Sequence, residues 1–312
     1  MIKTAVLMAT YNGENFIIDQ LESIKNQEMK PDYVIFRDDK STDKTVEKIR
    51  SFIEENSLEN WIINQNDNNL GWRLNFRALL LDVLNLDVDY VFFSDQDDTW
   101  YLNKNKIQVD IMETNKNIDL LSADIDIVKI SEHATIPNQF QFDDSDQYIS
   151  QYPHNINYIN YRQGWTFCIR KSFVDFLTPY WNDNLILSHD NLFAGVSGIL
   201  GTGYNYNHPV GVHKRHAGNA SGNALKISDT REKHIYELKI FLSYYVILSE
   251  ALNKLDNNDM ELANKYRNFY EKRVENAQNR KFLSTVKQII NDKKFYLNFT
   301  NWVRDLLFLF KR

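Results

Sequence analysis

The first 125 residues alternate between two kinds of apolar spacing. Short continuous apolar runs, typical of strands buried on both faces, are followed by stretches whose apolar residues recur at helical spacing. The expected strands lie at residues 5–8, 32–39, 61–66, 90–93 and near 120, and the expected helices at 15–27, 46–53, 74–86 and 103–114. Because neighbouring parallel strands need a crossover connection, this alternation predicts an α/β fold with a mainly parallel sheet flanked by helices.

Polar clusters follow three of the expected strands. They read TYNG at 10–13, DDKSTD at 38–43 and SDQDDTW at 94–100. Since ligands of such sheets bind at the carboxyl ends of strands, we expect the three clusters to share one edge. In the last cluster, Asp95, Asp97 and Asp98 stand so close together that each disfavours ionisation of the others. Such a group indicates a hard cation held by oxygens, or an aspartate that acts as a nucleophile.

Composition excludes several classes of protein. The net charge of −6 argues against general nucleic-acid binding, which needs a basic surface. The single cysteine, Cys168, excludes an internal disulfide framework and is expected to be a buried small side chain. No run of 18 apolar residues predicts a transmembrane helix, and the N-terminus lacks the apolar core of a signal peptide. We therefore expect a cytoplasmic protein.

The C-terminal part differs in pattern from the rest. From about residue 224 the sequence is helical and strongly charged, so we expect an α/β domain at 1–222 and a helical region at 223–312 that associates with a membrane or with a second copy. Residues 293–312 combine large apolar side chains with Lys and Arg near both ends, as in amphipathic helices that lie in a membrane interface. The alternative is a helix docked on the α/β domain or on a dimer partner.

Four motifs in order resemble the inverting family 2 glycosyltransferases with a GT-A fold, over roughly residues 3–222. They are MATYNG at 8–13, DDKSTDKT at 38–45, SDQDD at 94–98 and SHDN at 188–191. Lys40 replaces a glycine that is usual in the second motif, and His189 replaces an acidic residue in the fourth. SDQDDTW and HKRHAGNASG at 213–222 are most similar to bacterial rhamnosyltransferase-type members, although His213 and Lys214 stand where those often carry Tyr and Arg.

The resemblance implies a divalent metal, Mn²⁺ or Mg²⁺, that stabilises the charge of a departing diphosphate. Asp97 would be the direct ligand, and Asp95 would face the ribose or a metal-bound water. Asp98 is interpreted as a turn or helix-start residue. His216 would complete the metal shell or contact the diphosphate, and Lys214 would neutralise phosphate together with the neighbouring Arg215.

The resemblance also implies a nucleotide pocket. Asp39 would accept a hydrogen bond from the N3–H of a pyrimidine base. Asp38 could do this instead, and the alternative for both aspartates is that they cap the second helix. Thr10, Tyr11 and Asn12 would line the same pocket, with the flat face of Tyr11 beside the base. Arg73 would reach the diphosphate from the start of the third helix, with a surface position as the alternative.

Inverting transfer needs a base that deprotonates the acceptor hydroxyl, and Asp190 is our choice. His189 is a second candidate for this proton transfer or for acceptor binding, and the alternative is an orienting or packing role. Trp165 could form a platform on which an acceptor sugar stacks, and the alternative is a core tryptophan.

The sequence thus predicts a metal-dependent inverting glycosyltransferase. Its expected donor is dTDP-rhamnose, with UDP-hexoses as the alternative. The expected acceptor is a saccharide of a bacterial cell-surface or capsular polysaccharide, which could be linked to a lipid. Two other classes stay open: Asp95, Asp97 and Thr99 also spell the motif of haloacid-dehalogenase-like phosphatases, and a degenerate transferase fold could serve as a carbohydrate-binding protein.

Overall fold

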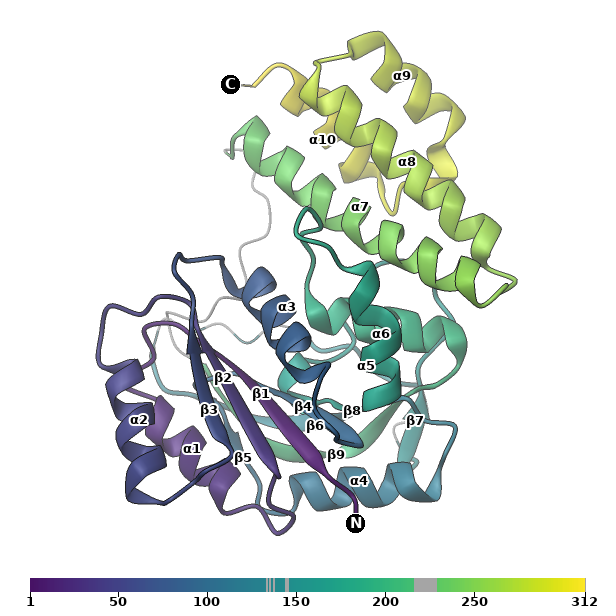
Figure 1. The fold of residues 1–312 in the computed structure, drawn as a ribbon. Coiled ribbons are helices and arrows are strands. Elements are labelled where there is room, and N and C mark those ends of the chain that lie inside the picture. The colour runs from purple at the N-terminus through teal and green to yellow at the C-terminus, as the bar shows by residue number, and fades with distance from the viewer. Residues whose placement is uncertain (133, 135, 137, 144–145, 216–228, 312) are drawn as a thin grey trace. The chain divides into compact units, whose positions relative to one another are not determined.

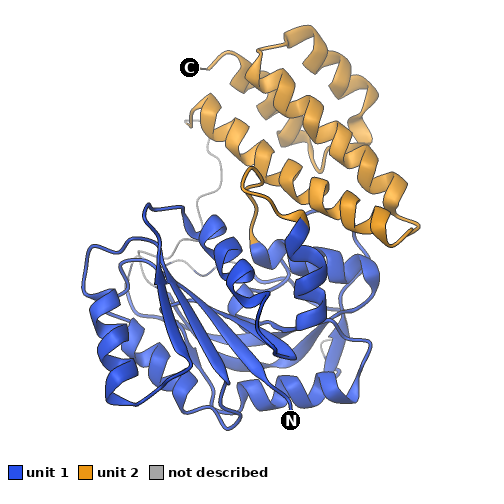
Figure 2. Cartoon of the chain, in the orientation of Figure 1, with its two compact units in different colours: residues 1–179, 189–220 blue, residues 180–188, 221–312 orange. Residues whose placement is uncertain are grey.

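The computed structural model describes residues 1–132, 134, 136, 138–143, 146–215 and 229–311. By its internal contacts the chain divides into two compact units (Figure 2). Unit 1 comprises residues 1–179 and 189–220, and unit 2 comprises residues 180–188 and 221–312. The segment 180–188, which the sequence places in the α/β domain, therefore belongs by contacts to the helical unit. The domain division at residue 222 stays a prediction.

Unit 1 is built on one mixed sheet. Its strand order is β3-β2-β1-β4-β8-β6-β9-β5, and β7 pairs with β9 beside this path. The strands are β1 (Thr4–Thr10), β2 (Tyr33–Asp38), β3 (Trp61–Gln65), β4 (Tyr90–Ser94), β5 (Thr99–Trp100), β6 (Leu120–Lys129), β7 (Ile149–Gln151), β8 (Cys168–Arg170) and β9 (Gly203–Arg215). The four strands from β3 to β4 are parallel, and β8 joins them antiparallel to both β4 and β6.

Helices cover both faces of the sheet (Figure 1). The helices of unit 1 are α1 (Ile17–Lys25), α2 (Thr45–Glu55), α3 (Trp72–Val83), α4 (Lys104–Thr114), α5 (Lys171–Leu177) and α6 (His189–Leu200), with the 3-10 turn η1 (Gly164–Thr166). A second 3-10 turn, η2 (Thr178–Tyr180), begins in unit 1, and its last residue belongs to unit 2. One face packs its strand residues against α1, α2 and α4 in a single apolar cluster. On the other face, Phe93 of β4 meets Phe76 of α3 and Phe193 of α6. The expected α/β architecture is therefore confirmed.

The register of the parallel strands places the polar clusters at one edge. Thr10 pairs with Asp38, so β1 and β2 end at the same level, and Met8 pairs with Ser94, so β4 ends two residues earlier at the same edge. Asp38 in turn pairs with Gln65 at the end of β3. Residues that follow these strands therefore project from the carboxyl edge of the sheet, where the sequence predicts the site.

Unit 2 is a bundle of helices. It contains α7 (Arg231–Lys254), α8 (Met260–Gln278), α9 (Phe282–Asn291), the 3-10 turn η3 (Lys293–Phe295) and α10 (Phe299–Leu309). Asp305 fastens α10 to α8, because its carboxylate accepts two hydrogen bonds from Arg273, each of 2.8 Å, in a buried ion pair. Among the described helices, none has both the length and the apolar character needed to cross a bilayer.

Candidate active site

Hydrogen bonds hold the loops after β1 and β4 together. The side-chain amide of Gln96 donates to the Tyr11 carbonyl and accepts from the Tyr11 N–H, each at 2.9 Å. This pair of bonds fixes the backbone of Tyr11, while its ring stays exposed. The first and third polar clusters thus meet at the edge of the sheet, as the sequence predicts.

The loops after β1 and β2 are joined in the same way. Asn12 Oδ1 accepts from the Thr42 N–H at 2.9 Å, and the Asn12 N–H donates to Ser41 Oγ at 2.9 Å. Thr10 is buried, and its hydroxyl donates to Asp38 Oδ2 at 3.0 Å. Asn12 has a positive φ of 47°, a conformation that asparagine tolerates better than most residues. The strand-end loops therefore form one rigid surface.

Asp39 is buried and already holds several donors. Its carboxylate accepts from the Leu70 N–H at 2.7 Å, the Gly71 N–H at 2.8 Å and the Asn66 side chain at 2.9 Å. These bonds fix the loop that leads into α3. Since a carboxylate offers about four acceptor positions, they use most of its capacity. Its role toward a pyrimidine base stays a prediction.

The carboxyl groups after β4 disfavour one another's ionised forms. Burial raises the pKa of Asp95 well above its usual value, and the neighbouring Asp98 and Asp97 raise it further. Burial likewise raises the pKa of Asp98, whose Oδ1 lies 2.6 Å from His213 Nδ1. This contact explains why Asp98 is buried, which its interpretation as a simple turn residue does not.

His213 and Arg215 are residues whose position the sequence did not reveal. Both lie at the end of β9 and are buried, and Arg215 Nη1 lies 3.3 Å from His213 Nε2. Burial lowers the pKa of His213, and the charges of Asp95 and Asp97 act in the opposite direction. His213 therefore contacts the carboxylate group at Asp98, and Arg215 contacts the other side of the His213 ring.

The metal ligands are only partly assembled in the described residues. No group of three or more His, Cys, Asp or Glu side chains is placed there to hold a metal ion. Asp98 contacts His213, and Asp95 and Asp97 are the other two carboxyl groups that follow β4. His216 lies outside the described residues. Two oxygen-bearing side chains fit a hard divalent ion that takes its remaining ligands from phosphate and water.

Asp190 lies in the first turn of α6. Burial raises the pKa of Asp190 to about 6, while the Asn191 N–H, at 2.8 Å from Oδ1, and the charge of Arg73 lower it. The charge of Asp190 also contributes to raising the pKa of Asp95, so the two carboxyl groups lie within electrostatic range of each other. Arg73 is thus near Asp190, and its contact with a diphosphate stays a prediction. A carboxyl group with this pKa is suited to accept a proton near neutral pH.

His189 is enclosed by aromatic rings. Its imidazole stacks on Phe76, with ring centroids 3.7 Å apart, and meets Phe93 edge to face at 4.6 Å. Neither ring nitrogen has a hydrogen-bond partner among the residues that the structure describes, and burial lowers the pKa of His189 to about 3. The ring is therefore neutral, which fits the packing alternative. Gly164 lies against it, since a Cβ there would be 2.2 Å from His189 Nε2 and 3.3 Å from Asp190 Cβ.

Two other predicted site residues have different surroundings from those expected. Trp165 is 1% exposed and belongs to the apolar cluster of unit 1, so its faces fit the core alternative better than a sugar platform. Lys214 Nζ pairs with Asp19 Oδ2 of α1 at 2.8 Å. Its role toward phosphate therefore stays a prediction that requires this ion pair to open.

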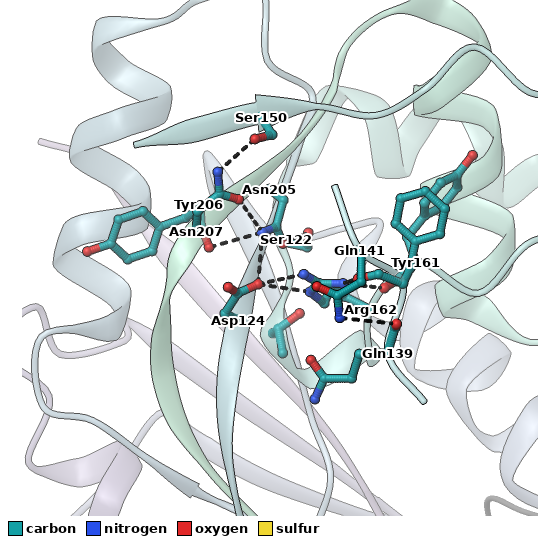
Figure 3. Close-up of polar contacts among 12 residues, drawn as sticks. Ser122, Asp124, Gln139, Gln141, Ser150, Tyr161, Arg162, Asn205, Tyr206 and Asn207 are labelled. Atoms are coloured by element: carbon teal, nitrogen blue, oxygen red, sulfur yellow. Dashed lines mark hydrogen bonds and ion pairs between the residues drawn. The ribbon is translucent and has the colours of Figure 1, made fainter. Parts of the chain in front are cut away.

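A polar network around Arg162 was not predicted from the sequence. Arg162 is buried and donates to Asp124 Oδ1 at 3.1 and 2.6 Å (Figure 3). It also donates to the carbonyl of Phe140 at 2.5 Å. Asn205 of β9 donates to the same Asp124 oxygen at 3.0 Å. Arg162 thus ties the segment before Gly164 to β6. No sequence period marks it, because its partners lie 22 and 38 residues away.

Comparison with known proteins identifies this arrangement. The model of glycosyl transferase family 2 matches residues 5–171. The chain belongs to this family. The dTDP-rhamnosyl transferase RfbG of Shigella flexneri is 39% identical over 109 residues, which are 35% of this chain and 37% of RfbG. The chain therefore matches little more than a third of that relative.

Solved structures confirm the GT-A fold of this family 2 member. S. aureus TarS 1–349 in complex with UDP aligns with a TM-score of 0.60 at 17% identity, over 98% of this chain and 90% of that one. The mannosyltransferase PcManGT of Pyrobaculum calidifontis, in complex with GDP-Man and Mn²⁺, aligns with a TM-score of 0.53 at 13% identity, over 98% and 84%. The family assignment leaves no support for the phosphatase alternative.

Proposed function

We propose that this family 2 member is a metal-dependent inverting glycosyltransferase with dTDP-rhamnose as its donor. The observation that supports the activity is the carboxyl group of Asp190, which has a pKa of about 6 and lies within electrostatic range of Asp95. The local likeness to the dTDP-rhamnosyl transferase RfbG supports the donor. The alternative is a UDP-hexose donor, which the likeness to TarS in complex with UDP-GlcNAc favours.

In this mechanism each residue has one task. Asp190 accepts the proton of the acceptor hydroxyl while that oxygen forms a bond to the anomeric carbon. The bond from the anomeric carbon to the diphosphate breaks with its electron pair, and the nucleoside diphosphate leaves. Arg73 and Lys214 offset its negative charge. Thr10, Tyr11, Asn12 and Asp39 bind the nucleoside.

Asp95 and Asp97, with His216, would hold the divalent ion. When bound, Mn²⁺ or Mg²⁺ supplies a charge that stabilises the leaving diphosphate. The like-charge group after β4 supports this assignment, because a bound cation would relieve the repulsion that raises the pKa of Asp95.

The acceptor we propose is a saccharide of a bacterial surface polysaccharide, carried on a lipid. The enzyme would then work in the cytoplasm at the inner face of the membrane, with residues 293–312 in peripheral contact. A homodimer is the alternative use of these residues.

The proposal is tested by release of nucleoside diphosphate. The enzyme is incubated with dTDP-rhamnose, UDP-glucose, UDP-galactose or UDP-GlcNAc in the presence of Mn²⁺, with lipid-linked and free saccharide acceptors. We expect acceptor-dependent release of dTDP, which stops in the Asp190→Asn variant and in a chelator. Release from a UDP-sugar alone would select the alternative donor. Wild-type turnover by Asp190→Asn would remove Asp190 from its role.

A further inference from the structure

Helix α9 packs with its polar side inward. Thr285 and Gln288 are buried, and Gln288 is satisfied there: it accepts from Asn276 Nδ2 and donates to the Phe269 carbonyl, each at 2.9 Å. On the same helix Leu283 is 81% exposed and Ile290 is 71% exposed. A surface helix normally turns its apolar side chains toward the core. In α9 two polar residues instead take the buried positions, Val286 and Ile289 are half-buried, and the remaining apolar side chains face outward.

The end of α10 continues this apolar surface. The ring centroids of Phe282, at the start of α9, and Phe310, just after α10, are 5.8 Å apart. Phe310 is 73% exposed and Phe299, at the start of α10, is 64% exposed. We call the surface formed by Phe282, Leu283, Ile290, Phe299 and Phe310 the α9–α10 face. Single exposed apolar residues are ordinary, but a group of this size marks an interaction surface.

The C-terminal segment is basic, whereas the chain as a whole is acidic. The whole chain has a net charge of −6, yet residues 280–312 contain eight Lys and Arg against two Asp. One of these two, Asp305, is buried in its ion pair with Arg273. Lys287, Lys293 and Lys294 are exposed within the same segment. The α9–α10 face is therefore apolar and bordered by cations.

An apolar face bordered by cations fits a lipid surface better than a second copy of the chain. A second copy related by a two-fold axis would bring the same patch against itself, with cations facing cations. A bilayer that contains anionic lipids offers apolar depth to Leu283, Ile290 and Phe310 and negative headgroups to the lysines.

We infer that the α9–α10 face docks on an anionic lipid surface. The inference rests on the proposed function for its purpose, because a lipid-linked acceptor would be presented at that surface. The contact with the membrane then includes α9 in addition to residues 293–312, and α9 supplies two of its most exposed apolar residues.

The test is flotation of the full chain with vesicles of phosphatidylcholine plus phosphatidylglycerol, and with vesicles of phosphatidylcholine alone. The apolar variant is Leu283→Ser/Ile290→Ser, and the charge variant is Lys287→Glu/Lys294→Glu. The matched control is Leu255→Ser, because Leu255 is 48% exposed and lies after α7, outside the α9–α10 face. Since the substituted residues are exposed, the variants should fold, and their melting temperatures check this.

We expect the wild type and Leu255→Ser to float with the anionic vesicles. The apolar variant should lose about tenfold or more in vesicle affinity, as expected when two large aliphatic side chains no longer insert. The charge variant should lose its preference for anionic vesicles. Wild type that floats with neither vesicle, or an apolar variant that floats like wild type, would overturn the inference. The inference would also be overturned if the wild type binds no vesicles and light scattering shows a dimer that the apolar substitutions dissociate.

Nucleotide binding separates this inference from the proposed function. All variants should keep the thermal shift of wild type with dTDP and Mn²⁺, because the substitutions lie in unit 2. A protein that floats but binds no nucleotide would refute the proposed function and leave the docking surface standing. The opposite result would refute only the docking surface.

Discussion

The two sides of the candidate site differ in the polarity of their side chains. The strand-end loops after β1, β2 and β4 are polar and joined by hydrogen bonds between side chains and backbone, as at Gln96 and Asn12. The junction between η1 and α6 is aromatic and close-packed, and no described residue forms a hydrogen bond with His189 there. The first side is suited to hold a polar nucleotide. The second raises the pKa of a carboxyl group by keeping water away from it.

The largest expected effect comes from removing the charge at this junction. Asp190→Asn should lower transfer by about 10²- to 10⁴-fold, the usual contribution of a general base, without weakening donor binding. Steady-state kinetics and nucleotide titration check the two halves of this prediction. Loss of donor binding in step with turnover would instead place Asp190 among the nucleotide-binding residues.

The same substitution should stabilise the fold. The pKa of Asp190 is about 6 in the folded chain, against a usual 3.8, so the folded state loses stability as the pH rises between these values. Asp190→Asn removes this loss and should raise the free energy of unfolding by roughly 2 kcal/mol above pH 7, with no gain below about pH 4. Urea unfolding at both pH values measures it. A stabilisation that is equal at both would contradict the burial of an ionisable group here.

The next effect tests the packing of the junction. Gly164→Ala would place a Cβ 2.2 Å from His189 Nε2, and His189 cannot yield because Phe76 and Phe93 enclose it. We expect a loss of about 1–3 kcal/mol in unfolding free energy and a fall in turnover. Gly198→Ala is the matched control, since its Cβ would meet nothing closer than 3.4 Å. Equal melting temperatures for the two variants would show that the junction is loosely packed.

Transfer should also depend on pH through Asp190. Because the base must be ionised, turnover divided by KM should rise with pH and reach half of its plateau near pH 6 in the free enzyme. The pH profile of a single donor–acceptor pair measures it. A profile that is flat between pH 5 and pH 8 would mean that the junction does not raise the pKa of its base.

The smallest effect concerns the strand-end loops. Lys40 has a φ of 66°, a conformation that costs a non-glycine residue about 1 kcal/mol. Lys40→Gly should therefore raise the melting temperature by roughly 2–4 °C while leaving nucleotide binding intact. Ser57→Gly, at φ 52° beyond the site, is the control for strain alone. A stabilised Lys40→Gly variant that has lost nucleotide affinity would reveal a role for the Lys40 ammonium group.

The same contrast explains how far the sequence could predict the structure. Residues 94–98 follow an apolar run, and strand ends of a parallel sheet meet at one edge, so local pattern and a topological rule were enough to gather the loops. The pairing of Asp98 with His213 spans 115 residues, and no local period reports it. The same limit hid Arg162 and its partner Asp124. For the same reason the sequence could not decide between a sugar platform and a core position for Trp165, because burial depends on what packs around a side chain.

In unit 2 the sequence predicted the helices and the basic, apolar C-terminus, but not which side of each helix is covered. Helix α9 buries Thr285 and Gln288 only because Asn276 and the Phe269 carbonyl satisfy the glutamine. An amphipathic pattern alone would place its apolar side chains inward. The outward face of α9 therefore had to come from the structure.

The most direct test of the account is the thermal shift of the full chain with dTDP, UDP, GDP and ADP, each with Mn²⁺, with Mg²⁺ and with a chelator. A ligand at a hundred times its dissociation constant adds about 2.7 kcal/mol to the stability of the native state. We predict a shift of several degrees with dTDP that requires the metal and disappears in Asp97→Ala. Absence of a shift with every nucleotide would contradict the assignment of the carboxyl edge as a nucleotide-sugar site.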